Sequence, residues 1–129
     1  MIRRMEEKKY SGILIMNSYK DLEVWKDSIL LIKEVYRIIN LLPKTEEYNL
    51  KLQLRRAVTS IALNIAEGKG RKSKKDFTNF LTIAFGSLME VQAILDICTE
   101  LGYIKEDIKV RQSIDILSKR INKLRGFLK

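Results

Sequence analysis

The sequence contains no histidine, one cysteine, one proline and six glycines in 129 residues. The absence of histidine excludes Ser-His-Asp and Cys-His catalytic arrangements and the most common metal sites. The single cysteine, Cys98, cannot close an intramolecular disulfide, and zinc and iron–sulfur sites need several cysteines. So few turn-forming residues disfavour a β-sandwich or barrel and favour a few long helices.

Length and charge narrow the class of protein further. A chain of 129 residues, 46% hydrophobic and 32% charged, is typical of one soluble globular domain. The 25 Lys and Arg residues exceed the 16 Asp and Glu residues and give a net charge of +9. This excess favours polyanionic partners such as nucleic acid.

The amino-terminal segment, residues 1–17, is predicted to be a flexible arm, and residues 18–129 are predicted to form the fold. Its longest apolar run, residues 13–16, is too short for a secretory signal. By inspection, no stretch reaches the roughly 20 apolar residues of a membrane span. We therefore expect a cytoplasmic protein with no membrane partner.

Apolar residues recur every three or four positions in four segments, which predicts helices over about 20–42, 50–68, 74–101 and 105–128. The predicted buried stripes are Leu22, Trp25, Ile29, Ile32, Tyr36 and Ile39; Leu50, Leu54, Ala57, Val58, Ile61 and Ile65; Phe77, Leu81, Ala84, Leu88, Val91, Leu95 and Cys98; and Val110, Ile114, Leu117, Ile121, Leu124 and Leu128.

The predicted helices are joined by short connections. Pro43 ends the first helix, Gly68 and Gly70 end the second, and Ser73 caps the third together with Asp76. Short connections make consecutive helices antiparallel, so the predicted fold is all-α, an antiparallel up-down-up-down four-helix bundle. The first helix carries a second apolar set, Leu30, Leu31, Val35, Ile38 and Leu42. This set either covers a partner or packs against two neighbouring helices.

A polar stripe interrupts the apolar pattern of segment 50–68. Gln53, Arg56, Ser60, Asn64 and Glu67 share one face, and segment 74–101 carries Ser87 and Glu90. We predict a structural polar network among these seven residues, with a partly buried Arg56–Glu90 ion pair, and we expect Lys69 and Arg71 to compensate Glu67 at its helix end. The stripe contains no nucleophile–base pair, so we expect no catalytic residue, no enzyme activity, no cofactor and no metal.

Cations gather in two places, which are the predicted nucleic-acid-binding residues. The first group is Lys69, Arg71, Lys72, Lys74 and Lys75; the second is Lys119, Arg120, Lys123 and Arg125, with Lys129 beyond it. We expect the two groups to lie at opposite ends of the bundle. Helix-turn-helix, zinc-finger and RNP signatures are absent from the sequence, so binding should be largely independent of base sequence.

Several short motifs occur in order along the chain: YKDLEVW from Tyr19, LPK from Leu42, EYNL from Glu47, QLRRA from Gln53, SI from Ser60, NIAEGKG from Asn64 and SLME from Ser87. In this order they resemble the four-helix-bundle proteins encoded in intervening sequences of 23S ribosomal RNA genes. The chain is similar also to the accessory variability determinant of diversity-generating retroelements, a homopentameric bundle that binds nucleic acid and a reverse transcriptase through basic surface. The resemblance thus implies a homopentamer and a nucleic-acid role.

The residues and the resemblance together predict a non-enzymatic oligomer that binds nucleic acid, with RNA favoured, through basic surface. The alternative is a scaffold or accessory protein that binds a protein partner such as a reverse transcriptase.

Overall fold

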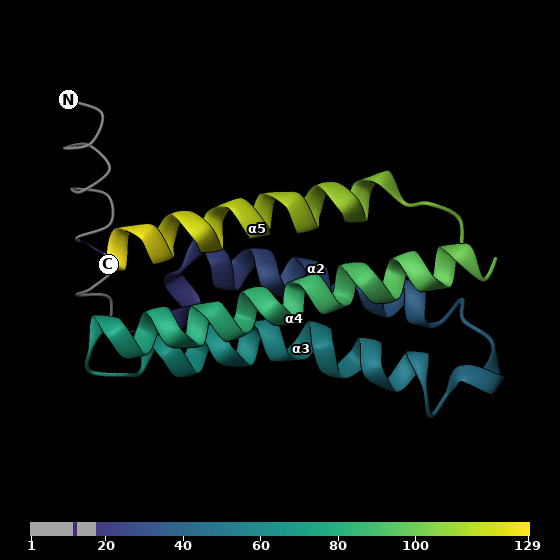
Figure 1. Cartoon of the computed structure of the whole chain (residues 1–129), viewed down its shortest axis with the longest axis horizontal. Coiled ribbons are helices and arrows are strands. Elements are labelled where there is room, and N and C mark those ends of the chain that lie inside the picture. Colours follow the sequence, from purple (N-terminus) through teal and green to yellow (C-terminus); the bar gives the residue numbers. More distant parts are fainter. Residues whose placement is uncertain (1–11, 13–17) are drawn as a thin grey trace.

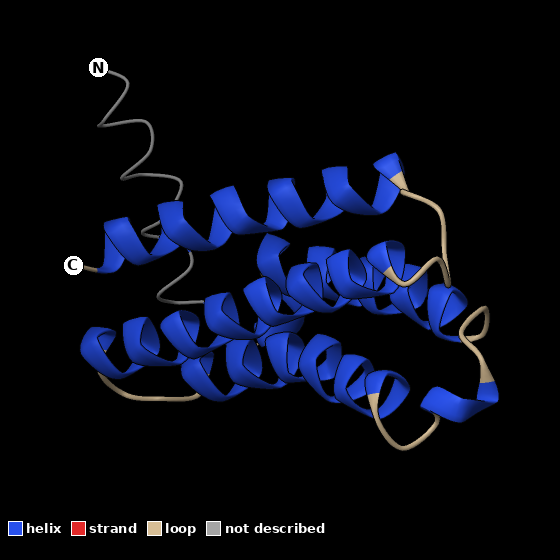
Figure 2. Cartoon of the chain, turned by 45° about the vertical axis from the view of Figure 1, so that its right-hand side comes forward, coloured by secondary structure: helices blue, strands red, loops and turns tan. Residues whose placement is uncertain are grey.

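The computed structural model describes Gly12 and residues 18–129, and the described residues form helices and loops without a strand (Figure 2). Four long helices, α2 (Glu23–Ile39), α3 (Leu50–Lys69), α4 (Lys74–Glu100) and α5 (Ile108–Leu128), run side by side with alternating direction (Figure 1). The predicted all-α four-helix bundle is confirmed. The predicted amino-terminal arm lies outside the described residues, apart from Gly12.

Capping side chains set the helix starts. Ser73 Oγ accepts a hydrogen bond from the Asp76 amide at 3.1 Å, as predicted. The last helix begins at Ile108 and not near residue 105, because Asp107 Oδ1 accepts from the Val110 amide at 3.1 Å. The first helix begins at Glu23, after a separate 3₁₀ turn, η1 (Tyr19–Asp21), that Ser18 caps.

Two helix ends depend on local backbone geometry. Gly102, at φ +75°, ends α4, and its amide bonds to the Thr99 carbonyl while the Tyr103 amide bonds to the Cys98 carbonyl. This pair of bonds is the Schellman motif, which favours glycine at the left-handed position. The α2 helix ends at Ile39, and a second 3₁₀ turn, η2 (Lys44–Glu46), follows Pro43.

Three of the four predicted core stripes are buried in full, those of α3, α4 and α5. The stripe predicted for α2 is confirmed only in part. Its ends, Leu22 and Ile39, are buried, and Trp25 and Ile32 pack against the core, but Tyr36 is 40% exposed. Because α2 packs against both α3 and α5, its buried face is wider than one stripe and includes the second apolar set, with Leu30 alone of that set exposed. That set therefore packs within the chain.

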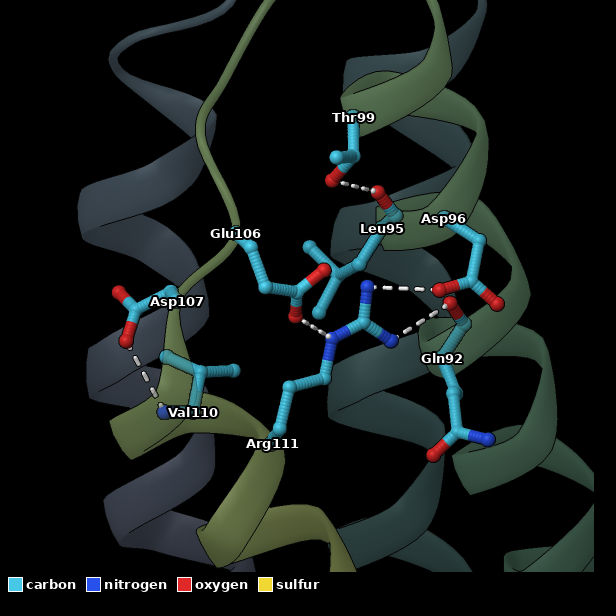
Figure 3. Close-up of polar contacts among 8 residues, drawn as sticks. All are labelled: Gln92, Leu95, Asp96, Thr99, Glu106, Asp107, Val110 and Arg111. Carbon is cyan, nitrogen blue, oxygen red and sulfur yellow. Dashed lines mark hydrogen bonds and ion pairs between the residues drawn. The ribbon is translucent and has the colours of Figure 1, made fainter.

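The Arg111 side chain fixes α5 against α4 (Figure 3). Its guanidinium lies 2.7 Å from Asp96 Oδ1 through Nη2 and 2.6 Å from Glu106 Oε1 through Nε. Its Nη1 donates to the Gln92 carbonyl at 3.4 Å. One cation thus joins α4, the α4–α5 connection and the first turns of α5.

The apolar character of α4 was underestimated from the sequence. Its length and composition would allow it to cross a membrane, with a mean hydropathy of 1.5 over 18 residues, of which 33% are buried. The expectation that no stretch resembles a span was therefore wrong, because polar Thr, Ser and Asn residues concealed a long stretch that is almost free of charge.

Candidate nucleic-acid interface

The start of α4 and the carboxyl-terminal end of α5 lie at the same end of the bundle (Figure 1). This corrects the expectation that the two cation groups occupy opposite ends. Consecutive helices alternate in direction, so the first turn of one helix is beside the last turn of the next. We call this region the basic end; its cations are Lys69, Arg71, Lys72, Lys74, Lys75, Arg125 and Lys129.

A surface pocket of about 420 Å³ lies where the two helices meet. Its lining combines Lys74, Lys75, Thr78 and Asn79 of α4 with Leu128 and Lys129. Three ammonium groups, one hydroxyl and one amide therefore surround a single depression. These groups can all donate hydrogen bonds, which suits phosphate oxygens.

Four lysines of the basic end have no acidic partner in the part of the chain that the structure describes. They are Lys72, Lys74, Lys75 and Lys129, and all four are exposed. We call them the unpaired lysines. An ammonium group that no carboxylate neutralises keeps its full charge for a phosphate.

Arg71 and Arg125 make contacts within the chain. Arg71 Nη2 lies 2.7 Å from Glu67 Oε1, and its guanidinium stacks 4.8 Å from the centre of the Phe80 ring. The Arg71 compensation of Glu67 was predicted, and the structure confirms it. The Arg125 guanidinium lies 5.4 Å from the centre of the Phe85 ring. Each of these rings thus has a guanidinium over one of its faces.

The remaining predicted cations differ in their surroundings. Lys119 pairs with Asp115 at 2.9 Å, and Arg120 Nη1 binds both Asp27 oxygens at 2.8 and 2.7 Å. Their charges are largely compensated inside the chain. Lys69 is half-buried at the end of α3, and Lys123 is exposed on α5.

The predicted polar network divides into separate contacts. The Ser60 and Ser87 hydroxyls lie 2.9 Å apart, and Asn64 Nδ2 donates to Ser60 Oγ at 2.9 Å, which joins α3 to α4. Gln53 instead bonds to Asn49, at 2.8 Å, ahead of the helix. The structure therefore brings Ser60, Asn64 and Ser87 together and leaves Gln53 apart from them.

The predicted Arg56–Glu90 ion pair is absent from the described residues. Both side chains are exposed, and neither makes an ion pair or hydrogen bond there. The prediction was wrong because both lie on the solvent side of the Ser60–Ser87 contact. An exposed pair gains too little to hold two long side chains together.

A family model, the 23S rRNA-intervening sequence protein, matches residues 20–123. The chain belongs to this family. One solved structure is a protein with unknown function from the S23 ribosomal protein family of Bacteroides thetaiotaomicron. It has 24% sequence identity and a TM-score of 0.58, over 81% of this chain and 94% of that chain. A search of curated proteins found no match.

The comparisons confirm the resemblance to the 23S rRNA-intervening sequence proteins, and the solved structure supports their bundle fold. The resemblance to the accessory variability determinant stays a prediction. For this member of the 23S rRNA-intervening sequence family, the basic end brings together four lysines that have no acidic partner among the described residues.

A buried carboxylate was missed in the sequence. Glu34 of α2 is 3% exposed, and its Oε1 accepts a hydrogen bond from Ser113 Oγ of α5 at 2.9 Å. Its Oε2 is buried and has no hydrogen-bond partner in the part of the chain that the structure describes. The helical spacing could have predicted its burial, because Glu34 follows Leu31 by three positions and so lies on the buried face of α2.

The described residues include no group of three or more His, Cys, Asp or Glu side chains that could hold a metal ion. Cys98 is buried in the core, as predicted. Burial, and then the negative charge of Glu46, raise the pKa of the Cys98 thiol. A buried, protonated thiol is a poor nucleophile.

Proposed function

We propose that this family member is a non-enzymatic oligomer that binds nucleic acid, with RNA favoured, through its basic end. The observation that carries the proposal is the meeting of Lys74, Lys75 and Lys129 around one pocket, without carboxylate partners in the described chain. Phosphates that replace the counterions of these lysines release those ions, which drives binding.

The same surface supports binding that is largely independent of base sequence. Single-stranded nucleic acid is read by aromatic side chains that stack on bases. Here Arg71 covers the Phe80 ring and Arg125 covers the Phe85 ring. Among the described residues of the basic end, a cation lies over one face of each of these two rings, which favours contact through charge with the sugar–phosphate chain.

The family supports RNA over DNA as the polyanion. Its name refers to an intervening sequence of 23S rRNA. Oligomerisation would multiply the contact, because several basic ends attached to one assembly bind one long strand with avidity. The homopentamer rests on the resemblance given above.

Gel shifts with single-stranded RNA and DNA at low and moderate salt test this function. The test variant changes Lys72, Lys74, Lys75 and Lys129 to Gln. The control variant changes Lys33, Lys44, Lys105 and Lys109 to Gln, which removes the same charge from exposed lysines outside the basic end.

We expect the wild type and the control to shift RNA at low salt, and the test variant to lose at least tenfold in affinity. Equal affinity of the two variants would contradict a role for the basic end. A wild type that shifts neither polymer at low salt would contradict nucleic-acid binding altogether.

A scaffold that binds a protein partner is the second candidate. It is supported by apolar side chains in the α2–α3 connection, where Leu41 is 69% and Tyr48 is 90% exposed. A partner such as a reverse transcriptase follows from the resemblance. Partner binding that Tyr48→Ser abolishes, with unchanged RNA shifts, would support this second function.

A further inference from the structure

The pocket of the basic end gathers more positive charge than one phosphate of a continuous strand can neutralise. Lys74 and Lys75 of α4 line it together with Lys129, and all three are exposed. Asp76, the acidic residue in the first turn of α4, is not part of the lining. Because a phosphodiester carries a single negative charge, it would leave two of the three ammonium groups unmatched.

The hydrogen-bond donors of the pocket favour the same kind of ligand. The Thr78 hydroxyl already donates to the Lys74 carbonyl at 2.9 Å. The three ammonium groups and the Asn79 amide have no partner among the described residues, so they remain available to a ligand. A phosphomonoester has three free oxygens and a charge of about −1.5 to −2 at pH 7, and it therefore matches this set better than a diester does.

We propose that this pocket binds the terminal phosphate of a nucleic-acid strand, a phosphomonoester at its 5′ or 3′ end. This role rests on the proposed function, and it names the part of the strand that the pocket holds. Arg71 and Lys72 of the basic end do not line the pocket. They are left to contact the diester groups that follow along the strand.

The size and the lining of the pocket suit the end of a strand. Its volume of about 420 Å³ lies within the range of roughly 300–1,000 Å³ that small-ligand sites have. Leu128 lines the pocket and is 3% exposed, so an apolar side chain lies beside the cations. The ribose carbons of a terminal nucleotide can pack against Leu128 while the phosphate contacts the lysines.

A lipid headgroup can carry the same phosphomonoester, but the pocket suits it less well. Proteins that lie on a membrane surface combine cations with apolar side chains that enter the headgroup region. None of the large apolar side chains that are exposed in the described chain lines this pocket. The surroundings of the pocket therefore favour a strand end.

Fluorescence anisotropy with four single-stranded RNAs, each labelled at an internal position, tests the pocket. Three share one sequence and end in a 5′-phosphate, in a 3′-phosphate or in hydroxyl groups only. The fourth has hydroxyl ends and is two nucleotides longer, so it carries the added charge as diesters. Affinities are measured at moderate salt, and circular dichroism checks that each variant is folded.

Two variants change the pocket, and each has a matched control. Asn79→Asp places a carboxylate in the pocket, and Gln112→Glu adds the same charge on α5 outside the basic end. Lys75→Gln removes an ammonium group from the pocket, and Lys72→Gln removes one from the basic end outside the pocket.

We expect the wild type to bind at least one phosphate-ended RNA about tenfold more tightly than both hydroxyl-ended RNAs, the effect of one further charge-assisted contact. Asn79→Asp and Lys75→Gln should lose this preference, and both controls should keep it. Equal binding of all four RNAs by the wild type, or a preference that the pocket variants keep, would overturn the terminal-phosphate site and leave the proposed function intact. A wild type that binds none of the RNAs would overturn both.

Two further ligands separate a strand end from other phosphomonoesters. Uridine 5′-monophosphate should bind more weakly than the preferred RNA, because it lacks the diesters that the rest of the basic end contacts. Equal affinity for the mononucleotide would overturn the strand end in favour of a free nucleotide. Wild-type chain that sediments with phosphatidic acid vesicles and shows no preference among the RNAs would overturn it in favour of a lipid headgroup.

Discussion

A Cβ built on Gly68 of α3 would lie 2.7 Å from the Cβ of Phe80 on α4. Real Cβ atoms do not approach so closely, so the packing of the two helices at this point requires glycine. Gly68 lies inside α3 and is buried. Its role is therefore close helix packing. Of the two glycines predicted to end this helix, Gly70 is its C-cap, as predicted, whereas Gly68 lies within the last turn.

Gly68→Ala should destabilise the bundle by about 1–3 kcal/mol, because the added methyl group forces α3 and α4 apart. Urea unfolding followed by circular dichroism measures the change. Gly126→Ala on α5 is the matched control, since a Cβ there meets no atom of the described residues within 4 Å. The control should stabilise by about 0.5–1 kcal/mol through helix propensity. A neutral or stabilising Gly68→Ala would disprove the close contact.

Replacement of the buried Glu34 by Gln should leave stability unchanged or raise it by about 1 kcal/mol. The amide keeps an acceptor for Ser113 Oγ and replaces a carboxyl group whose second oxygen has no hydrogen-bond partner among the described residues. Burying an amide costs less than burying an ionised carboxylate. Thermal unfolding of wild type and Glu34→Gln at neutral pH measures the difference. A Tm several degrees lower in the variant would contradict this reasoning.

Stability should fall as the pH rises above about 9. Burial raises the pKa of Cys98 above its ordinary 9.0, and the hydrogen bond to Glu46 raises the pKa of Tyr103 above its ordinary 10.0. Both groups therefore keep their protons to a higher pH in the folded chain than in the unfolded chain. Their contribution to the free energy of unfolding is complete below the pKa values of the unfolded chain. It is lost as the pH rises through the pKa values of the folded chain.

Urea midpoints between pH 7 and 10.5 measure this dependence. Tyr103→Phe removes the hydroxyl that donates to Glu46 Oε2 at 3.0 Å, so its curve should be shallower above pH 10. Parallel curves for wild type and variant would show that Tyr103 does not contribute.

The periodic segments allowed most of the fold to be predicted, because α3, α4 and α5 each bury a single stripe. On α2 the apolar residues surround more than half of the helix, so periodicity could not select the face that two neighbours cover. The Arg56–Glu90 prediction followed charge and spacing alone. Whether two such groups meet depends on which side of the Ser60–Ser87 contact they occupy, and this is decided only by packing.

The candidate nucleic-acid interface was likewise predictable from the sequence only in part. The two cation groups were evident as clusters in the sequence, but they were expected at opposite ends of the bundle. They share one end because consecutive helices run in opposite directions, so the start of α4 lies beside the end of α5. Which cations remain available was not predictable, because Arg120 and its partner Asp27 are 93 residues apart. Such a contact exists only in the folded chain.

The central claim is that the unpaired lysines of the basic end hold phosphates. The most direct measurement is the slope of log K against log salt for a single-stranded RNA, by fluorescence anisotropy. Each phosphate contact contributes about 0.7 to the magnitude of that slope. The slope of the Gln variant of Lys72, Lys74, Lys75 and Lys129 should therefore be smaller in magnitude by up to roughly 3 for each protomer. The control variant of Lys33, Lys44, Lys105 and Lys109 should keep the wild-type slope. Equal slopes for both variants and the wild type would contradict the claim.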